Sequence, residues 1–187
     1  MPRLFIISGC NGSGKTTASY TVLPGLLDCS EFVNSDEFAK SLSPFHPEAA
    51  SIKAGRYMLE KTRYLFARRE DFCFETTLAT RSLLKIVRRA QDLGYFVTVL
   101  YLWLASPEVA IRRVAARVEA GGHDVPPDVI RRRYYAGLHY FFEDYAPACD
   151  KWILVDNTND AFTLVAEGSR KGMTVRDLDL YEQIKAL

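Results

Sequence analysis

The sequence predicts an α/β fold in which a sheet of about five mostly parallel strands lies between two layers of helices. Three observations support this fold. Short apolar runs alternate with helical patterns, one of these runs is apolar nearly throughout, and a glycine-rich loop follows the first run. Strands separated by helices are typical of a doubly wound parallel sheet. With 187 residues, the chain is expected to form one domain, residues 1–187.

The strands and helices are predicted from these alternating patterns. The strands are expected at Leu4–Ser8, Glu31–Asn34, Phe72–Glu75, Phe96–Leu104 and Trp152–Asp156. The fourth run is apolar along almost its whole length, which indicates a strand covered on both faces. The helices are expected at Lys15–Leu23, Pro47–Arg69, Arg81–Leu93, Pro107–Ala120, Pro127–Tyr145 and Ala161–Glu167. After Gly168 we expect a turn, a short strand at Thr174-Val175 and a final helix.

The glycine-rich loop is the most informative motif of the chain. Residues 9–16 read Gly-Cys-Asn-Gly-Ser-Gly-Lys-Thr and match the phosphate-binding pattern G-x-x-x-x-G-K-[ST] at every fixed position. The loop lies between a predicted strand and a predicted helix, which is the context that this motif requires. Its glycines allow the main-chain N–H groups to approach a phosphate closely. The pattern therefore predicts a P-loop that binds a nucleotide together with Mg²⁺. ATP is favoured over GTP, because Asp156-Asn157-Thr158-Asn159-Asp160 does not match the Asn-Lys-x-Asp pattern of GTPases.

Each residue of this loop has an expected role in binding the nucleotide. Lys15 is expected to reach the β- and γ-phosphates, and the Thr16 hydroxyl is expected to bind Mg²⁺. The cofactor-binding residues are Gly9, Cys10, Asn11, Gly12, Ser13, Gly14, Lys15, Thr16 and Thr17. Cys10 is interpreted as a reduced, small filling residue rather than an oxidation-sensitive centre.

A second candidate site follows the second predicted strand, where the sequence reads Asn34-Ser35-Asp36-Glu37. Ligands of open α/β sheets bind at the carboxyl ends of strands, so Asp36 is expected to face the same crevice as Lys15. A carboxylate at this place can accept the proton of a substrate hydroxyl as that hydroxyl attacks a phosphate. The alternative is that Asn34 or Ser35 caps a helix and that the two acids favour its positive end.

An acid and two hydroxyl residues end the third predicted strand. Glu75 is the nearest counterpart of a Walker B acid, and we expect it to bind Mg²⁺ through water or to hold a substrate hydroxyl. Thr76 and Thr77 are expected to bind substrate or to cap the next helix. Arg81 is a further substrate-binding candidate, with a solvated helix charge as the alternative.

A pair of glycines and a pair of prolines predict a hinged helical hairpin, a lid, over about residues 107–145. The arginines in this segment are Arg112, Arg113, Arg117, Arg131, Arg132 and Arg133. A mobile hairpin with arginines can close over ATP, neutralise charge on the transferred phosphoryl group and exclude water. The alternative is a set of solvated helix faces, and the residues alone leave open which arginine contacts phosphate.

The composition excludes several classes of protein. The net charge of +1 gives the whole molecule no excess of positive charge for nucleic acid or a membrane surface. The four cysteines are widely spaced and the three histidines do not cluster with them, so neither a zinc site nor a disulfide framework is predicted. No apolar run is long enough to span a bilayer or to serve as a signal peptide. We therefore expect a cytoplasmic protein that does not bind membranes.

Taken together and in this order, the motifs resemble the zeta toxin family of P-loop kinases. The resemblance covers about residues 3–158. It implies a P-loop kinase fold and an enzyme that transfers phosphate from ATP to the 3′-hydroxyl of the sugar in UDP-N-acetylglucosamine, with an antitoxin as a candidate partner. It also implies that Asp36 is the general base, that Glu75 positions substrate, and that Arg117 and Arg132 act in the transition state. Arg113 and Arg133 are the alternates for these arginines.

Two other functions remain open from the sequence. The first is a kinase for another small acceptor, such as a nucleoside, an antibiotic or another metabolite. The second is a P-loop ATPase switch that acts on a protein or RNA partner. Asp36 and the closing lid favour a kinase over a switch, because a hydrolase would need a group that positions water.

Overall fold

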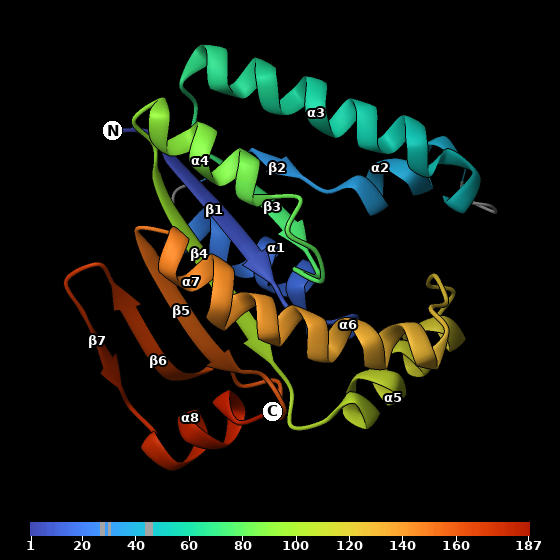
Figure 1. The fold of residues 1–187 in the computed structure, drawn as a ribbon. Coiled ribbons are helices and arrows are strands. Elements are labelled where there is room, and N and C mark those ends of the chain that lie inside the picture. Colours follow the sequence, from blue (N-terminus) through green and yellow to red (C-terminus); the bar gives the residue numbers. More distant parts are fainter. Residues whose placement is uncertain (27–28, 30, 44–46) are drawn as a thin grey trace.

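The strands form one seven-stranded sheet within the part of the chain that the computed structural model describes, which is residues 1–187 except 27, 28, 30 and 44–46 (Figure 1). The strand order is β2-β3-β1-β4-β5-β6-β7. The strands are β1 (Arg3–Ser8), β2 (Phe32–Val33), β3 (Phe72–Thr76), β4 (Phe96–Trp103), β5 (Lys151–Asp156), β6 (Thr163–Ser169) and β7 (Gly172–Val175). Strands β1 to β5 pair in parallel, which confirms the predicted fold class, and β6 and β7 add an antiparallel hairpin.

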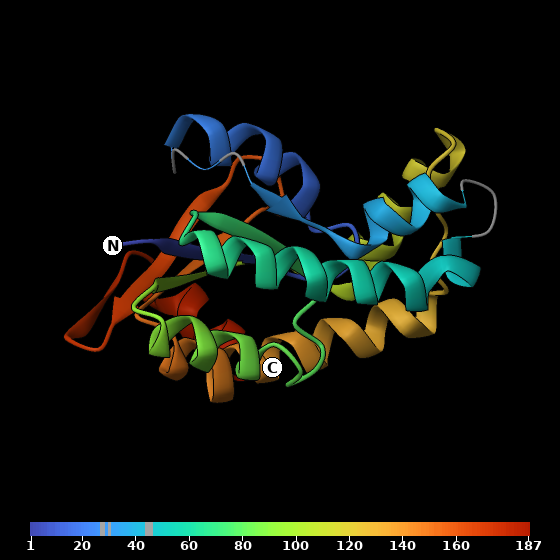
Figure 2. The same ribbon diagram turned by 90° about the horizontal axis from the view of Figure 1, so that it is seen from above.

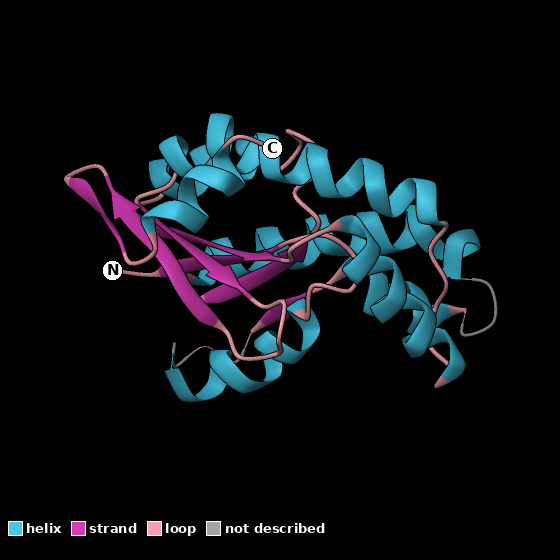
Figure 3. Cartoon of the chain, turned by 90° about the horizontal axis from the view of Figure 1, so that it is seen from below, coloured by secondary structure: helices cyan, strands magenta, loops and turns pink. Residues whose placement is uncertain are grey.

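Helices lie on both sides of the sheet (Figure 3). They are α1 (Lys15–Leu26), α2 (Ser35–Leu42), α3 (Ser51–Arg68), α4 (Leu84–Asp92), α5 (Pro107–Glu119), α6 (Pro127–Tyr140), α7 (Ala146–Ala148) and α8 (Leu178–Lys185). A 3₁₀-helix (Pro47–Ala50) precedes α3, and a π-helical turn (Phe141–Tyr145) follows α6. In Figure 2, α1 lies on the opposite side of the sheet from α4 and α7, so the sandwich has three layers.

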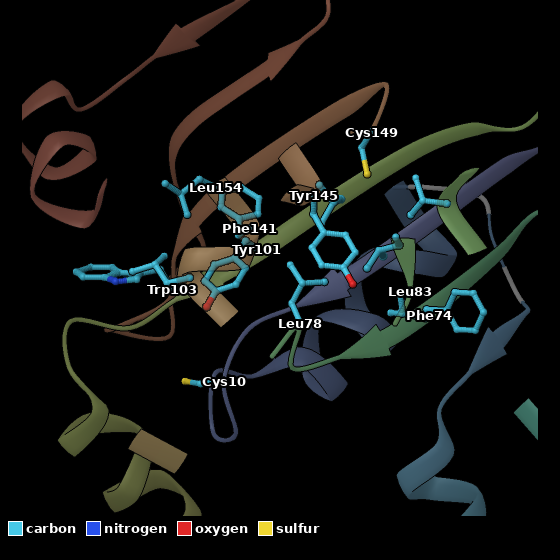
Figure 4. Packing of buried hydrophobic residues seen from close by; sticks show 14 of the residues in the cluster. Cys10, Phe74, Leu78, Leu83, Tyr101, Trp103, Phe141, Tyr145, Cys149 and Leu154 are labelled. Atoms are coloured by element: carbon cyan, nitrogen blue, oxygen red, sulfur yellow. The ribbon is translucent and has the colours of Figure 1, made fainter. Parts of the chain in front are cut away.

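The core is divided by the sheet because successive side chains of a strand point to opposite faces. In β1, Leu4 and Ile6 join the large cluster under α4, α6 and α8, whereas Phe5 and Ile7 join a smaller cluster that includes Ala18 of α1. Figure 4 shows part of the large cluster. Both faces of β1 are thus buried, and each fully buried large apolar side chain stabilises the fold by about 1.5–3 kcal/mol. This explains why the runs in β1 and β4 are apolar rather than alternating.

One predicted element is wrong. The segment Ala161–Glu167 was expected to be helical, but residues 163–169 form β6, which pairs antiparallel with β5. Without β6, the outer edge of β5 would leave its backbone N–H and C=O groups unpaired. The β-branched Thr163 and Val165 suit a strand, and positive φ angles at Asp160 and Phe162 reverse the chain before it. Pairing with the edge of β5 therefore overrode the local helical pattern.

The predicted helical hairpin is present as α5 and α6. Gly121 has a φ of 85°, and the N–H groups of Gly121 and Gly122 donate to the carbonyls of Val118 and Arg117 at 2.9 and 2.8 Å. This arrangement is a Schellman motif, in which a residue with positive φ ends the helix. Ahead of α6, Pro126 and Pro127 begin the second helix. The α5–α6 hairpin and the α2–α3 pair both extend beyond the carboxyl ends of the central strands (Figures 1 and 2).

Helix α6 packs directly on the chain that leaves β3, and Gly137 makes this approach possible. A Cβ atom at Gly137 would lie 2.6 Å from the carbonyl oxygen of Thr77 and 3.1 Å from the Tyr101 hydroxyl. By contrast, a Cβ atom at Gly55 in α3 would meet no atom within 4 Å.

These two glycines give a matched pair of tests. We expect Gly137→Ala to lower the free energy of unfolding by about 1–3 kcal/mol, because α6 must move away from β3. Gly55→Ala should raise it by about 0.5–1 kcal/mol, because alanine is the better helix former. Urea denaturation of both variants measures the two changes. Equal changes in the same direction would show that the close approach of α6 does not contribute to the free energy of unfolding.

Candidate active site

The candidate active site lies at the carboxyl ends of the central parallel strands. Strand β1 lies between β3 and β4 and leads directly into the P-loop, residues 9–16. The register pairs Ile7 with Glu75 and Ser8 with Thr76, so the end of β3 stands beside the start of the loop. Helix α2 begins after the short strand β2. The polar residues that follow three strands therefore meet at one edge of the sheet, as the sequence predicts.

The P-loop has the predicted backbone conformation, with positive φ angles at Gly9, Gly12 and Gly14. Two of these glycines are also sites of close packing. A Cβ atom at Gly12 would lie 2.7 Å from the carbonyl oxygen of Ala110 in α5, and one at Gly14 would lie 2.5 Å from the Asn157 side-chain nitrogen. Larger residues at these positions would push the loop away from its supports.

Lys15 is held within the loop. Its side chain is buried, and Nζ donates a hydrogen bond to the carbonyl oxygen of Cys10 at 2.9 Å. This contact folds the lysine back over the loop. Thr17 is exposed in the first turn of α1, where its main-chain N–H belongs to the positive end of the helix.

A chain of polar contacts crosses from the P-loop to α2. The Thr16 hydroxyl donates to the Glu75 carboxylate, with Oγ1 at 3.2 Å from Oε1 and 3.1 Å from Oε2. Asn34 Nδ2 donates to Glu75 Oε2 at 3.0 Å. Asn34 Oδ1 in turn accepts the main-chain N–H of Glu37 at 3.2 Å. The structure thus brings Thr16 and Glu75 together, as a metal site would require, and adds Asn34.

The turn after β2 shows one of the two interpretations that the sequence left open. Asn34 caps α2, so the capping alternative is confirmed for this residue. Asp36 lies in the first turn of α2, but its side chain is outside the described part of the structure. The role of Asp36 as general base stays a prediction.

The other substrate candidates have structural contacts. The Thr76 hydroxyl accepts the main-chain N–H of Leu78 at 3.0 Å, which fixes the turn after β3 rather than capping a helix, since α4 begins only at Leu84. The Thr77 carbonyl oxygen faces Gly137 of α6. Arg81 Nε donates to Asp144 at 2.9 Å, and its guanidinium lies over the Tyr140 ring. Substrate binding by these three residues stays a prediction.

The lid arginines divide into two groups. Arg133 Nη1 donates to Asn11 Oδ1 in the P-loop at 3.1 Å, and Arg113 Nη2 donates to the carbonyl oxygens of Asn157 and Thr158, both at 2.9 Å. By contrast, Arg117 Nη2 donates to the His123 carbonyl at 2.6 Å and closes the hairpin turn, and Arg132 is exposed. The structure therefore brings the two alternates, rather than Arg117 and Arg132, against the P-loop (Arg133) and against the segment after β5 (Arg113).

Asn157 is a supporting residue that the sequence pattern did not indicate. It follows β5, its side chain is buried, and Nδ2 donates to the Ser13 carbonyl at 2.8 Å. Its own main-chain N–H donates to the Trp103 carbonyl at 2.9 Å. Asn157 thus ties the end of β5 to the P-loop, and Arg113 ties α5 to the segment after β5. Only the tertiary structure reveals these contacts.

The residues present fit a bound Mg²⁺ ion. Mg²⁺ is usually held by one or two protein oxygen ligands together with substrate phosphates and water. The Thr16 hydroxyl and the Glu75 carboxylate supply hard oxygen atoms within hydrogen-bond distance of each other. Among the described residues, no group of three or more His, Cys, Asp or Glu side chains could form an all-protein metal site. The two oxygen ligands of Thr16 and Glu75 match the one or two protein ligands of a Mg²⁺ ion that also binds a nucleotide.

The fold and this loop define a P-loop protein, and comparison with known proteins agrees with this class. A family model described as an AAA domain matches residues 4–141, and the chain belongs to that family. A relative from Haemophilus influenzae, itself an uncharacterized protein, is 31% identical over 128 residues, which cover 67% of this chain and 88% of the relative.

Two groups of solved structures have the same fold. The chain matches AvrRxo1-ORF1:AvrRxo1-ORF2 structures with sulphate ions and with ATP, with TM-scores of 0.82 and 0.79 at 19% identity. These matches cover 99% of this chain, which spans 64% of the length of the matched chains. A structure of the PezAT chromosomal toxin-antitoxin system of Streptococcus pneumoniae matches with a TM-score of 0.74 at 17% identity, over 98% of this chain and 78% of the other. No described helix combines the length and apolar character needed to cross a membrane.

Cys10 is an inert part of this loop. Burial raises the pKa of its thiol to about 11, opposed in part by the positive charge of Lys15. A thiol with a raised pKa stays protonated at neutral pH, and the thiolate is the reactive form. The interpretation of Cys10 as a small filling residue agrees with this environment.

We therefore expect iodoacetamide to modify Cys10 at pH 8 at least about 100-fold more slowly in the folded protein than in urea, where the pKa returns to about 8.5. Peptide mapping by mass spectrometry measures the modification. In the folded protein the rate should rise as the pH increases toward 11. Rapid labelling of the folded protein at pH 8 would contradict the buried environment of the thiol.

Proposed function

We propose that this protein is an ATP- and Mg²⁺-dependent kinase that transfers the γ-phosphate of ATP to a hydroxyl of a small molecule. UDP-N-acetylglucosamine is the leading candidate acceptor. The observation that carries the proposal is the pairing of Thr16 with Glu75, at 3.1 and 3.2 Å, beside a complete P-loop. This pairing joins the phosphate-binding loop to a carboxylate at the place where a metal–nucleotide complex would lie.

The nucleotide is held by the loop in this proposal. Main-chain N–H groups of residues 9–16 and the start of α1 face the phosphates, and Lys15 reaches the β- and γ-phosphates. The likeness of the fold to a structure solved with ATP supports ATP as the phosphate donor. Thr16 and Glu75 would hold Mg²⁺, which would offset negative charge on the β- and γ-phosphates.

Asp36 accepts the proton of the acceptor hydroxyl in the proposed reaction. Its place supports this role, because it lies in the first turn of α2 and Asn34, two residues earlier, contacts Glu75. As the acceptor oxygen bonds to the γ-phosphorus, the bond between that phosphorus and the β,γ-bridging oxygen breaks, and ADP leaves. The hydroxyl proton passes to the Asp36 carboxylate.

The lid arginines neutralise charge on the transferred phosphoryl group. Among them, Arg133 has the strongest support, because its contact with Asn11 places a guanidinium at the P-loop. Arg117 and Arg132 remain candidates that would need the hairpin to rearrange.

A toxin with an antitoxin partner is the biological role that we propose. The fold of a protein from a system described as toxin-antitoxin supports this role, together with the order of motifs in the sequence. A cytoplasmic location belongs to the same proposal, because ATP is the donor. Growth arrest on expression in a bacterial host, relieved by Lys15→Ala, tests the toxin role directly.

The proposed reaction is tested by incubating the purified protein with ATP and Mg²⁺, with and without UDP-N-acetylglucosamine, and analysing the sugar nucleotide by mass spectrometry. A product heavier by one phosphoryl group supports the proposal. ATP turnover without that product would support a kinase that uses a different acceptor. A screen of nucleosides, antibiotics and sugars would then follow. ATP binding without turnover would favour a switch that needs a protein or RNA partner.

Replacing Asp36 separates proton transfer from nucleotide binding. We expect Asp36→Ala to retain ATP binding and to lower kcat by about 10²–10⁴-fold, the usual contribution of a general base. Lys15→Ala should lose both ATP binding and transfer. Isothermal titration calorimetry and product formation measure the two properties. Unchanged transfer by Asp36→Ala would remove this residue from the mechanism.

Replacing Arg133 tests the contribution of the lid. We expect Arg133→Ala to lower kcat by about 10³-fold or more, because an arginine on the transferred phosphoryl group contributes this much in related reactions. The matched control is Arg131→Ala, which removes an exposed arginine whose partner is Glu108 at 3.4 Å. Steady-state kinetics should show little change in the control. Equal losses in both variants would indicate a general effect on the hairpin.

A further inference from the structure

The side chain of Asn34 joins the two halves of the proposed active site. It follows β2 directly and uses both ends of its amide group. Nδ2 donates to Glu75 Oε2 at 3.0 Å, and Oδ1 accepts the main-chain N–H of Glu37 at 3.2 Å. One contact therefore reaches the candidate metal ligand on β3, and the other reaches the first turn of α2.

The contact with Glu75 holds a side chain that would otherwise have considerable freedom. A glutamate has one more rotatable bond than the aspartate of a Walker B site, and ordering it costs more side-chain entropy. Thr16 donates to the carboxylate from the P-loop, and Asn34 donates to it from the turn after β2. Two hydrogen-bond donors from different parts of the chain therefore restrict the directions that the carboxylate can adopt.

The contact with Glu37 fixes the start of α2. An asparagine at the N-cap position satisfies a main-chain N–H that has no partner within the helix. Asp36 lies between Asn34 and Glu37 in the chain, so the turn that carries the proposed general base is closed by the same amide. The orientation of the metal ligand and the start of α2 are therefore linked through one side chain.

We propose that Asn34 is a positioning residue that orients the Glu75 carboxylate toward Mg²⁺ and sets the first turn of α2 for the acceptor. This inference rests on the proposed kinase function and deepens it. Asn34 acts through Glu75 and through the helix, so it differs from a residue that only stabilises α2 by capping. Partners of this kind typically change metal affinity 10–100-fold when they are replaced.

The exchange Asn34→Ser separates the two contacts. Serine retains the ability to cap a helix, but its side chain is too short to reach Glu75. We expect Asn34→Ser to have a thermal unfolding midpoint close to that of the unaltered protein. Its affinity for Mn²⁺, measured by electron paramagnetic resonance with a non-hydrolysable ATP analogue, should fall about 10-fold or more. Asn34→Ala should lose the cap as well, so its kcat should stay low even when Mg²⁺ is saturating.

Two further variants test whether the effect passes through Glu75. In the Glu75→Gln background, adding Asn34→Ser should cause no further loss of Mn²⁺ affinity, because the group that Asn34 orients is already altered. The capping control is Asp177→Ala, since Asp177 Oδ1 accepts the Leu180 N–H at 3.0 Å at the start of the distant helix α8. That variant should lower the unfolding midpoint and leave Mn²⁺ affinity unchanged.

The outcomes distinguish the inference from the function on which it rests. Unchanged Mn²⁺ affinity in Asn34→Ser, with normal binding by the unaltered protein, would overturn the inference and leave the kinase proposal intact. Additive losses in Asn34→Ser and Glu75→Gln would overturn it as well, because the residues would then act independently. A protein that binds no Mn²⁺ with nucleotide before any substitution would overturn both proposals.

Discussion

The burial of β1 on both faces is the constraint on which the site depends. Because β1 lies between β3 and β4, with separate clusters of apolar side chains above and below it, its carboxyl end has a fixed place at the centre of the sheet edge. The parallel register sets Glu75 opposite Ile7, just before the P-loop begins. Thr16 at the far end of the loop can then meet the Glu75 carboxylate. The candidate metal site is thus a consequence of strand register.

The P-loop is supported by contacts that have no direct part in binding phosphate. Gly12 allows α5 to approach the loop, and Gly14 allows Asn157 to approach from the end of β5. The side chain of Arg133 adds a contact from α6 to Asn11. Both helices of the hairpin, α5 and α6, and the end of β5 therefore contact the P-loop. Movement of the hairpin would displace the P-loop, because closely packed groups cannot move independently of one another.

Charge is distributed around Glu75 in a way that suits a metal-assisted transfer. The Thr16 hydroxyl and the Asn34 amide donate to its carboxylate, and Lys15 and Arg133 donate to groups of the P-loop. A divalent cation bound by this carboxylate and by phosphate oxygens would add positive charge where charge must be neutralised during transfer.

The sequence by itself determined the P-loop, the five parallel strands and the helical hairpin, because each is encoded locally by glycine spacing, apolar runs or paired glycines and prolines. It also indicated that Lys15, Thr16 and Glu75 share one edge of the sheet. The tertiary structure decided that residues 163–169 form a strand, since the open edge of β5 required a partner. It also decided that Arg133 contacts the P-loop and that Asn34 contacts Glu75. These last contacts depend on strand register and helix rotation, which long-range packing sets and no local pattern encodes.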